Sequence, residues 1–134
     1  MKISLFLSVL IGIVFFTFLA FAQSDFDIVT LKEEDKGSEI TLRNRDVLVI
    51  LLKEVSTAGY KWDVVNFDRD KLLFIQSKSL KLSPPGLLGG PNLRIFVFKA
   101  VGLGRTPIQI VYHRPWENLG YPQKVFYVEA NIIK

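Results

Sequence analysis

The chain has 134 residues, of which 49% are hydrophobic and 22% charged, and its formal net charge is +4 at pH 7. This length suits one domain, and the apolar content is too high for a disordered chain. With no cysteine and a single histidine, His113, the sequence excludes disulfides, cysteine nucleophiles and thiolate metal sites. We therefore expect no cofactor and no bound metal, and the mild basicity does not indicate nucleic-acid binding.

The first 22 residues have the features of a secretory signal peptide. Lys2 precedes an apolar run over residues 3–21, which closes on Ala20-Phe21-Ala22. A positive start, an apolar stretch and a small-x-small end are typical of a cleaved leader. The run is also long enough to span a bilayer, so an uncleaved anchor is the alternative. We predict a signal peptide over 1–22 and one domain over 23–134. We expect the mature chain to be secreted or held in a lysosomal or phagosomal lumen, without membrane contact after cleavage.

From residue 28 onward the sequence predicts strands throughout. The predicted strands are Ile28 to Leu31, Glu39 to Arg43, Val47 to Leu52, Tyr60 to Val65, Leu72 to Ile75 with a polar continuation to Ser83, Leu93 to Phe98, Ile108 to Tyr112 and Phe126 to Ile132. Apolar and polar residues alternate in several of them, which is the period of a half-buried strand, and no segment keeps helical spacing for three turns. About eight short strands separated by turns predict an all-β fold, an immunoglobulin-like sandwich or barrel without a disulfide.

Two of these strands are apolar on both faces. Val47 to Leu52 is a continuous apolar run, and Leu93 to Phe98 places apolar residues on both sides. Such runs are typical of strands that are covered on both sides.

A turn is predicted at Gly102 to Arg105, ahead of the strand that starts near Ile108.

Three connecting segments have unusual composition. In the first, Val55 to Trp62, the residues alone indicate a hairpin turn with Gly59 at positive φ and Trp62 in the core. In the second, Pro84 to Pro91, glycines allow close backbone approach to a partner, and the pair Leu87-Leu88 either projects outward or folds back onto the core.

The third segment is Arg114-Pro115-Trp116. Arginine and tryptophan are enriched in binding hot spots, so this segment could bind a partner. Alternatively, Arg114 stacks on Trp116 as an internal cation–π pair. Both interpretations remain open from the residues themselves.

The neighbouring His113 gives little support to an enzyme. A catalytic histidine needs a nucleophile on one ring nitrogen and an orienting acid on the other, and no local residue pair supplies both. We expect a structural role for His113 and no catalytic residues. Another interpretation is an immunoglobulin-like binding module that holds carbohydrate or a surface protein through Trp116 and Tyr121.

Taken in order, the three segments resemble the chagasin family, immunoglobulin-like inhibitors of papain-like cysteine proteases. That family has Asn-Pro-Thr-Thr-Gly-(Tyr/Phe)-x-Trp, then Gly-x-Gly-Gly, then Arg-Pro-(Trp/Phe) in three loops. The residues that match are Thr57, Gly59, Tyr60 and Trp62 in the first motif, Gly89 and Gly90 in the second, and Arg114-Pro115-Trp116 in the third. The departures are Val55, Ser56 and Ala58 in the first motif and Leu87 in the second.

The resemblance implies a monomeric, reversible and tight-binding inhibitor of papain-family enzymes of the cathepsin L or B type. Three loops at one end of the sandwich would occlude the active-site cleft without a covalent step. The implied protease-binding residues are Ser56, Thr57, Ala58, Gly59, Tyr60, Leu87, Leu88, Gly89, Gly90, Arg114, Pro115 and Trp116. The first loop would enter over the catalytic cysteine, with the other two on either side.

Overall fold

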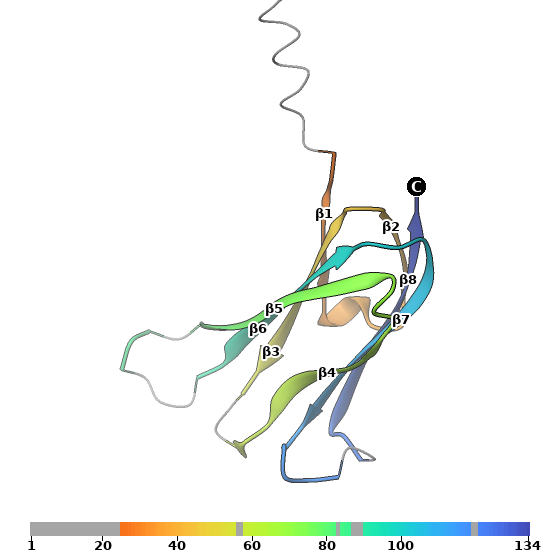
Figure 1. The fold of residues 1–134 in the computed structure, drawn as a ribbon. Helices are drawn as coiled ribbons and strands as arrows, with labels where there is room; N and C mark the ends of the chain where they lie inside the picture. The colour runs from red at the N-terminus through yellow and green to blue at the C-terminus, as the bar shows by residue number, and fades with distance from the viewer. Residues whose placement is uncertain (1–24, 56–57, 83, 87–89, 119–120) are drawn as a thin grey trace, which may run out of the picture.

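The computed structural model describes residues 25–55, 58–82, 84–86, 90–118 and 121–134. These residues form eight strands and one short 3-10 turn (Figure 1). The elements are β1 (Ile28–Lys32), η1 (Glu33–Asp35), β2 (Glu39–Arg43), β3 (Val47–Glu54), β4 (Lys61–Phe67), β5 (Leu72–Lys81), β6 (Asn92–Ala100), β7 (Gly104–His113) and β8 (Lys124–Ile133). The all-β prediction is confirmed, and each predicted strand corresponds to an observed one.

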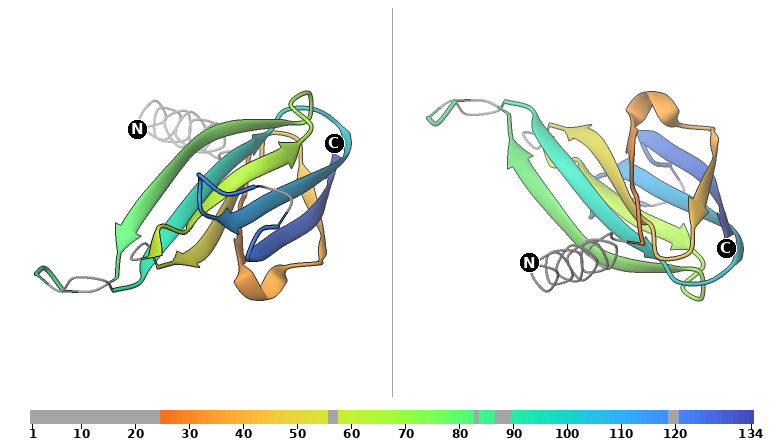
Figure 2. Two further views of the ribbon diagram at one scale, coloured as in Figure 1. Left: turned by 90° about the horizontal axis from the view of Figure 1, so that it is seen from below. Right: turned by 90° about the horizontal axis from the view of Figure 1, so that it is seen from above.

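The strands form two four-stranded sheets that pack as two layers (Figure 2). One sheet has the order β1-β3-β6-β5 and the other the order β2-β8-β7-β4. β1 pairs parallel with β3 and β2 pairs parallel with β8, whereas the other neighbours are antiparallel. This is the immunoglobulin-like sandwich that the strand pattern predicts.

The core lies between the two sheets. Alternate residues of each strand point inward, so β3 contributes Leu48, Ile50 and Leu52 while Phe126 and Val128 of β8 face them from the other sheet. Trp62 is 3% exposed and belongs to this core, as the sequence predicts. Among the described residues, the core side chains run from Leu31 to Ile132.

Two expectations differ from the structure. β7 begins at Gly104, so Gly104 and Arg105 belong to a strand, although Gly102 to Arg105 is predicted as a turn; register with Ile132 and Asn131 of β8 extends the strand to this point. The run Val47 to Leu52 is a strand, but the prediction that both its sides are covered is wrong. Its inward side is buried, and its other side is only half-buried within the described part of the molecule.

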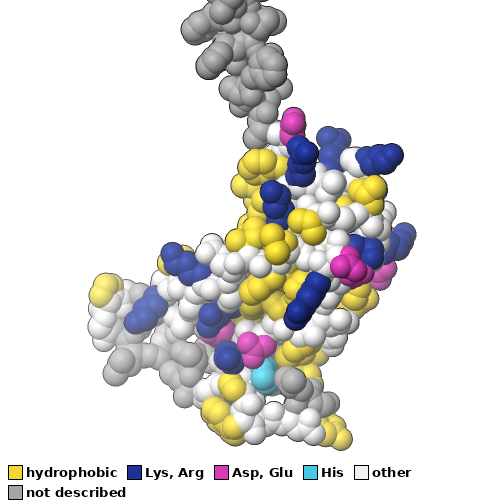
Figure 3. All heavy atoms as spheres, viewed as in Figure 1, with side chains coloured by type: hydrophobic (Ala, Val, Ile, Leu, Met, Phe, Trp, Pro, Cys, Tyr) yellow, Lys and Arg dark blue, Asp and Glu magenta, His cyan; other side chains and the backbone are white. Residues whose placement is uncertain are grey.

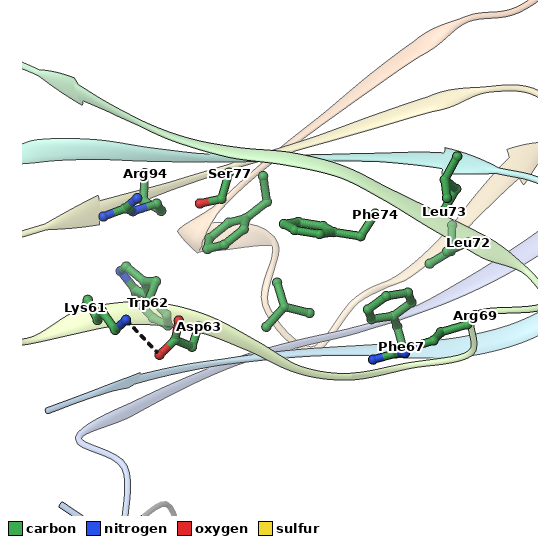
Figure 4. A pocket seen from close by; sticks show the side chains of 12 residues that line it. Lys61, Trp62, Asp63, Phe67, Arg69, Leu72, Leu73, Phe74, Ser77 and Arg94 are labelled. Carbon is green, nitrogen blue, oxygen red and sulfur yellow. Dashed lines mark ion pairs between the residues drawn. The ribbon is translucent and has the colours of Figure 1, made fainter. Parts of the chain in front are cut away.

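The sandwich has an open edge between β4 and β5. No described strand pairs with the outer edge of either strand, and each carries a bulge, at Val65 and at Ile75. A cleft of about 560 Å³ runs between them, with Phe67 and Phe74 pointing into it (Figure 4). Bulges twist an edge strand away from further pairing, which protects this edge from adding a strand of another chain.

Candidate functional site

Two loops that are distant in the sequence meet at the end of the sandwich opposite the C-terminus (Figure 1). Residues 55–60 join β3 to β4, and residues 114–123 join β7 to β8. β4 pairs with β7 so that Lys61 lies opposite His113 and Trp62 opposite Tyr112. This register places the two loops side by side.

Arg114 connects the two loops. Its Nε donates a hydrogen bond of 2.9 Å to the carbonyl oxygen of Ala58, and its guanidinium lies 4.5 Å from the centre of the Tyr60 ring. A second nitrogen donates to Glu117 at 3.1 Å. Tyr60 in turn stacks on Tyr112, with ring centres 5.3 Å apart. The internal cation–π pair therefore exists, but its aromatic partner is Tyr60 and not Trp116 as the sequence-based alternative supposed.

The contacts of Arg114 with Ala58 and Tyr60 are called the brace below. Trp116 is a large apolar side chain beside the brace. Its side chain is 71% exposed, so the indole does not belong to the core. Gly59 has φ +80 and lies so close to the indole that a Cβ at that position would overlap the ring. The indole rests against the Gly59 backbone on one side and leaves the rest of its surface free for a partner. The predicted positive φ of Gly59 is confirmed.

The third predicted loop leaves from the same end of the strands. Glu54 of β3 lies opposite Asn92 of β6, and Asn92 lies opposite Lys81 of β5, so the β5–β6 connection starts level with the end of β3. Its described part, residues 84–86, lies farther out than the other two loops (Figures 1 and 2). Gly90 is half-buried beside this connection.

Some of the predicted site residues lie outside the described residues. They are Ser56, Thr57, Leu87, Leu88 and Gly89. The structure brings together Ala58, Gly59, Tyr60, Arg114 and Trp116, and Pro115 is exposed between the last two.

Beneath the loops lies a buried polar support that the sequence did not reveal. Glu54 is 2% exposed; its carboxylate accepts two hydrogen bonds from Arg94, of 2.8 and 3.2 Å, and one of 2.9 Å from the backbone N–H of Trp62. The Tyr112 hydroxyl donates to the carbonyl oxygen of Val55 and accepts from its N–H, both at 3.1 Å. These contacts fix the end of β3 against β4, β6 and β7. The sequence signal that could have indicated this buried carboxylate is the position of Glu54 at the end of an apolar strand.

Comparison with protein families identifies one that covers most of the strands. A family model described as the chagasin family of peptidase inhibitors, I42, matches residues 41–130. The chain belongs to the chagasin family. The match runs from β2 into β8 and includes the three loops of the site. The resemblance carried by the loop motifs is thus confirmed at the level of the family.

Individual relatives support the same placement. Amoebiasin-2 of Entamoeba histolytica is 28% identical over 88 residues, which cover 65% of this chain and 71% of that protein. The cysteine protease inhibitor EhICP2 from Entamoeba histolytica has a crystal structure that matches with a TM-score of 0.73 and 24% identity, covering 83% of this chain and 100% of that one.

Two further solved structures share the fold. Amebosin matches with a TM-score of 0.67 and 23% identity, over 78% of this chain and 97% of that one. PbICP-C, solved in complex with falcipain-2, matches with a TM-score of 0.55 and 18% identity, over 83% of this chain and 92% of that one. At these identities, the structural matches establish a common chagasin-type fold.

His113 links two strands near the base of the Arg114 loop. It is 7% exposed, and its Nε2 lies 2.6 Å from Oδ2 of Asp63, which is also 3.7 Å from Nζ of Lys61. Its Nδ1 is buried and has no hydrogen-bond partner among the described residues. The single histidine is visible beside acidic and basic side chains near the lower end of the molecule (Figure 3). The ring thus ties β7 to β4 just before the Arg114 loop.

The described residues contain no group of three or more histidine, cysteine or acidic side chains placed to hold a metal ion. None of their helices is long and apolar enough to cross a membrane.

Proposed function

We propose that this protein is a reversible, tight-binding inhibitor of papain-family cysteine proteases of the cathepsin L or B type. Membership of a family of peptidase inhibitors supports this function, as do one structural relative described as a cysteine protease inhibitor and another solved in complex with falcipain-2. The observation that carries the proposal is the brace between Arg114 and Ala58, which holds two loops together and leaves Trp116 outward.

The inhibitory mechanism follows from what each loop presents. Ala58 and Gly59 have little or no side chain, so their backbone can approach a catalytic cysteine closely without offering a well-placed scissile bond. Trp116 supplies a large apolar surface for the wall of the protease cleft. Because Arg114 already links the loops, little conformational entropy is lost on binding, and a modest contact area can give tight inhibition.

The segment Leu87 to Gly90 is proposed as the third contact, at the side of the cleft. It lies in the connection between β5 and β6. These two strands end in register with Glu54, at the same end of the sandwich as the other two loops. Deleting this segment should change the preference among papain-like enzymes more than it changes inhibition as such. Equal loss of inhibition against papain, a cathepsin L and a cathepsin B would contradict this selective role.

The direct test is a titration of papain with the chain from Gln23 to Lys134, followed with a fluorogenic peptide. We expect stoichiometric loss of activity, recovery on dilution, and an uncleaved inhibitor by mass spectrometry. Unchanged turnover at micromolar inhibitor would refute the function. The alternative of a carbohydrate-binding module through Trp116 and Tyr121 has no support from the family.

We also propose that residues 1–22 direct the chain to the secretory pathway and are then removed, so that the inhibitor acts outside the cell or in a lysosomal or phagosomal lumen. The apolar run and its Ala20-Phe21-Ala22 end support this proposal. Sequencing the N-terminus of the protein recovered from the producing cells tests it. A chain beginning at Gln23 is expected, whereas a membrane-bound chain that retains Met1 would favour an uncleaved anchor.

A further inference from the structure

The outer face of the β1-β3-β6-β5 sheet is apolar at its centre. The side chains that point away from the core on its two central strands are Val47, Val49 and Leu51 of β3 and Leu93, Ile95 and Val97 of β6. β3 and β6 are neighbours, so these six residues form one continuous patch. Apart from η1 at one margin, no described element packs over it. A contiguous apolar patch of this kind marks an interaction surface.

Four lysines surround this patch. Lys32 lies in register with Leu51, Lys53 with Leu93, Lys78 with Ile95, and Lys99 with Val47. All four side chains are exposed, and none of them has an ion pair with a described carboxylate. The patch and these lysines together are called the basic apolar face below. At the margin of the sheet, Glu33 and Glu34 of η1 line a hollow together with Lys32 and Lys53.

The opposite outer face has a different character. There Arg105 lies between two carboxylates, 2.7 Å from Glu39 and 3.7 Å from Glu129, so positive and negative groups neutralise one another. The charges of the molecule are therefore divided unequally between its two faces. The outward positions of the β1-β3-β6-β5 sheet hold positive charge only, although the net charge of the whole chain is just +4.

This combination selects one kind of partner. An apolar centre gains free energy by leaving water, while lysine stems are long enough to keep their ammonium groups at a polar boundary. A second copy packed on the same face would bring the four lysines of each copy together, with only Glu33 and Glu34 at the margin to pair with them. We propose that the basic apolar face binds the surface of an anionic lipid bilayer, whose head groups supply the negative charge.

The proposal goes beyond the sequence expectation that the mature chain has no membrane contact. That expectation followed from cleavage of the predicted leader, whereas the clustering of four lysines depends on the register of four strands. It is also independent of protease inhibition. The inhibitory loops extend from the end of the strands, and the basic apolar face lies on their side, so a bilayer-bound inhibitor would still present Trp116.

The test is co-sedimentation of the chain from Gln23 to Lys134 with vesicles of phosphatidylcholine alone and of phosphatidylcholine mixed with phosphatidylserine. We expect binding to the mixed vesicles only, and weaker binding at high salt. The double variant Lys53→Gln/Lys99→Gln should bind about 25-fold more weakly, from roughly fivefold for each lysine. Val49→Thr, which keeps side-chain shape and strand preference, should also weaken binding because it reduces the apolar centre.

A matched control removes the same charge from the other face. Arg43→Gln/Arg105→Gln has the net charge of the lysine variant, and its vesicle binding should equal that of the unchanged protein. All variants should keep their thermal midpoint and their inhibition of papain. Absence of binding to the mixed vesicles, or equal loss in the two double variants, would overturn the proposal. A dimer in solution that Val49→Thr dissociates would assign the face to a second copy and overturn it as well.

Discussion

The contact between Gly59 and Trp116 allows a sharp test of how the loops are organised. In Gly59→Ala, the new Cβ would stand at φ +80, a backbone conformation that costs an L-residue about 1 kcal/mol. The same Cβ would overlap the indole, so Trp116 must also leave its resting position. We expect a loss of stability of about 1–2 kcal/mol and a loss of inhibition of about 1–3 kcal/mol, or roughly 5- to 150-fold in the inhibition constant.

Gly37 provides the matched control. It has φ +82, but a Cβ placed there meets no atom within 4 Å, so the added methyl group would touch neither Trp116 nor any other described residue of the loops. Gly37→Ala should therefore show the backbone cost alone, with inhibition unchanged. The measurements are thermal unfolding, in which 1 kcal/mol corresponds to roughly 4–8 °C, and titration of papain.

The double variant Gly59→Ala/Trp116→Ala separates the two contributions. Once the indole is absent, adding the methyl group should cost only the backbone term in stability, and it should weaken inhibition less than it does when Trp116 is present, because only the close approach of the residue 59 backbone to the protease is then disturbed. If Gly59→Ala inhibited papain as well as the unchanged protein, or if its effect were the same with and without Trp116, the indole would not depend on Gly59 and the reasoning would be wrong.

Three other predictions concern the same end of the molecule. Trp116→Ala should weaken inhibition of papain by about 1–3 kcal/mol at an unchanged Tm, since the side chain is 71% exposed. The control is Tyr127→Ala, which removes an exposed aromatic side chain from β8 and should leave inhibition unchanged. A large fall in the Tm of Trp116→Ala would place the indole in the core. Arg114→Lys keeps the charge but loses the planar stack on Tyr60, so inhibition should fall about five- to tenfold by titration of papain, and full retention would refute the brace. Glu54→Ala leaves Arg94 without its partner and should cost about 3–5 kcal/mol in chemical denaturation, a loss under 1 kcal/mol being inconsistent with a buried pair.

Much of the fold could be predicted from the sequence because strand formation leaves a local signal. Alternation with a period of two places Ile40 and Leu42 on one face of a strand, and the structure gives that strand the predicted bounds, Glu39–Arg43. The family was equally accessible, because its loop motifs are short and contiguous, as in Arg114-Pro115-Trp116. Both kinds of information extend over a few residues only.

The partner of Arg114 could not be predicted in the same way. Sequence proximity suggested Trp116, two residues along the chain, but the guanidinium lies on Tyr60 and its Nε binds Ala58, 56 positions away. That choice follows from the pairing of β4 with β7. The buried pair of Glu54 and Arg94, 40 positions apart, likewise depends on the pairing of β3 with β6.

The sequence by itself determined that the chain forms strands, how many there are, and which short motifs occupy the connections between them. Only the tertiary structure decided that the outward apolar side of β3 and β6 has no described cover and that Lys32, Lys53, Lys78 and Lys99 gather around it. The physical reason is range. Backbone preferences and side-chain alternation act between neighbours along the chain, whereas contacts between faces, loops and buried charges are set by the register of strands that are remote in sequence.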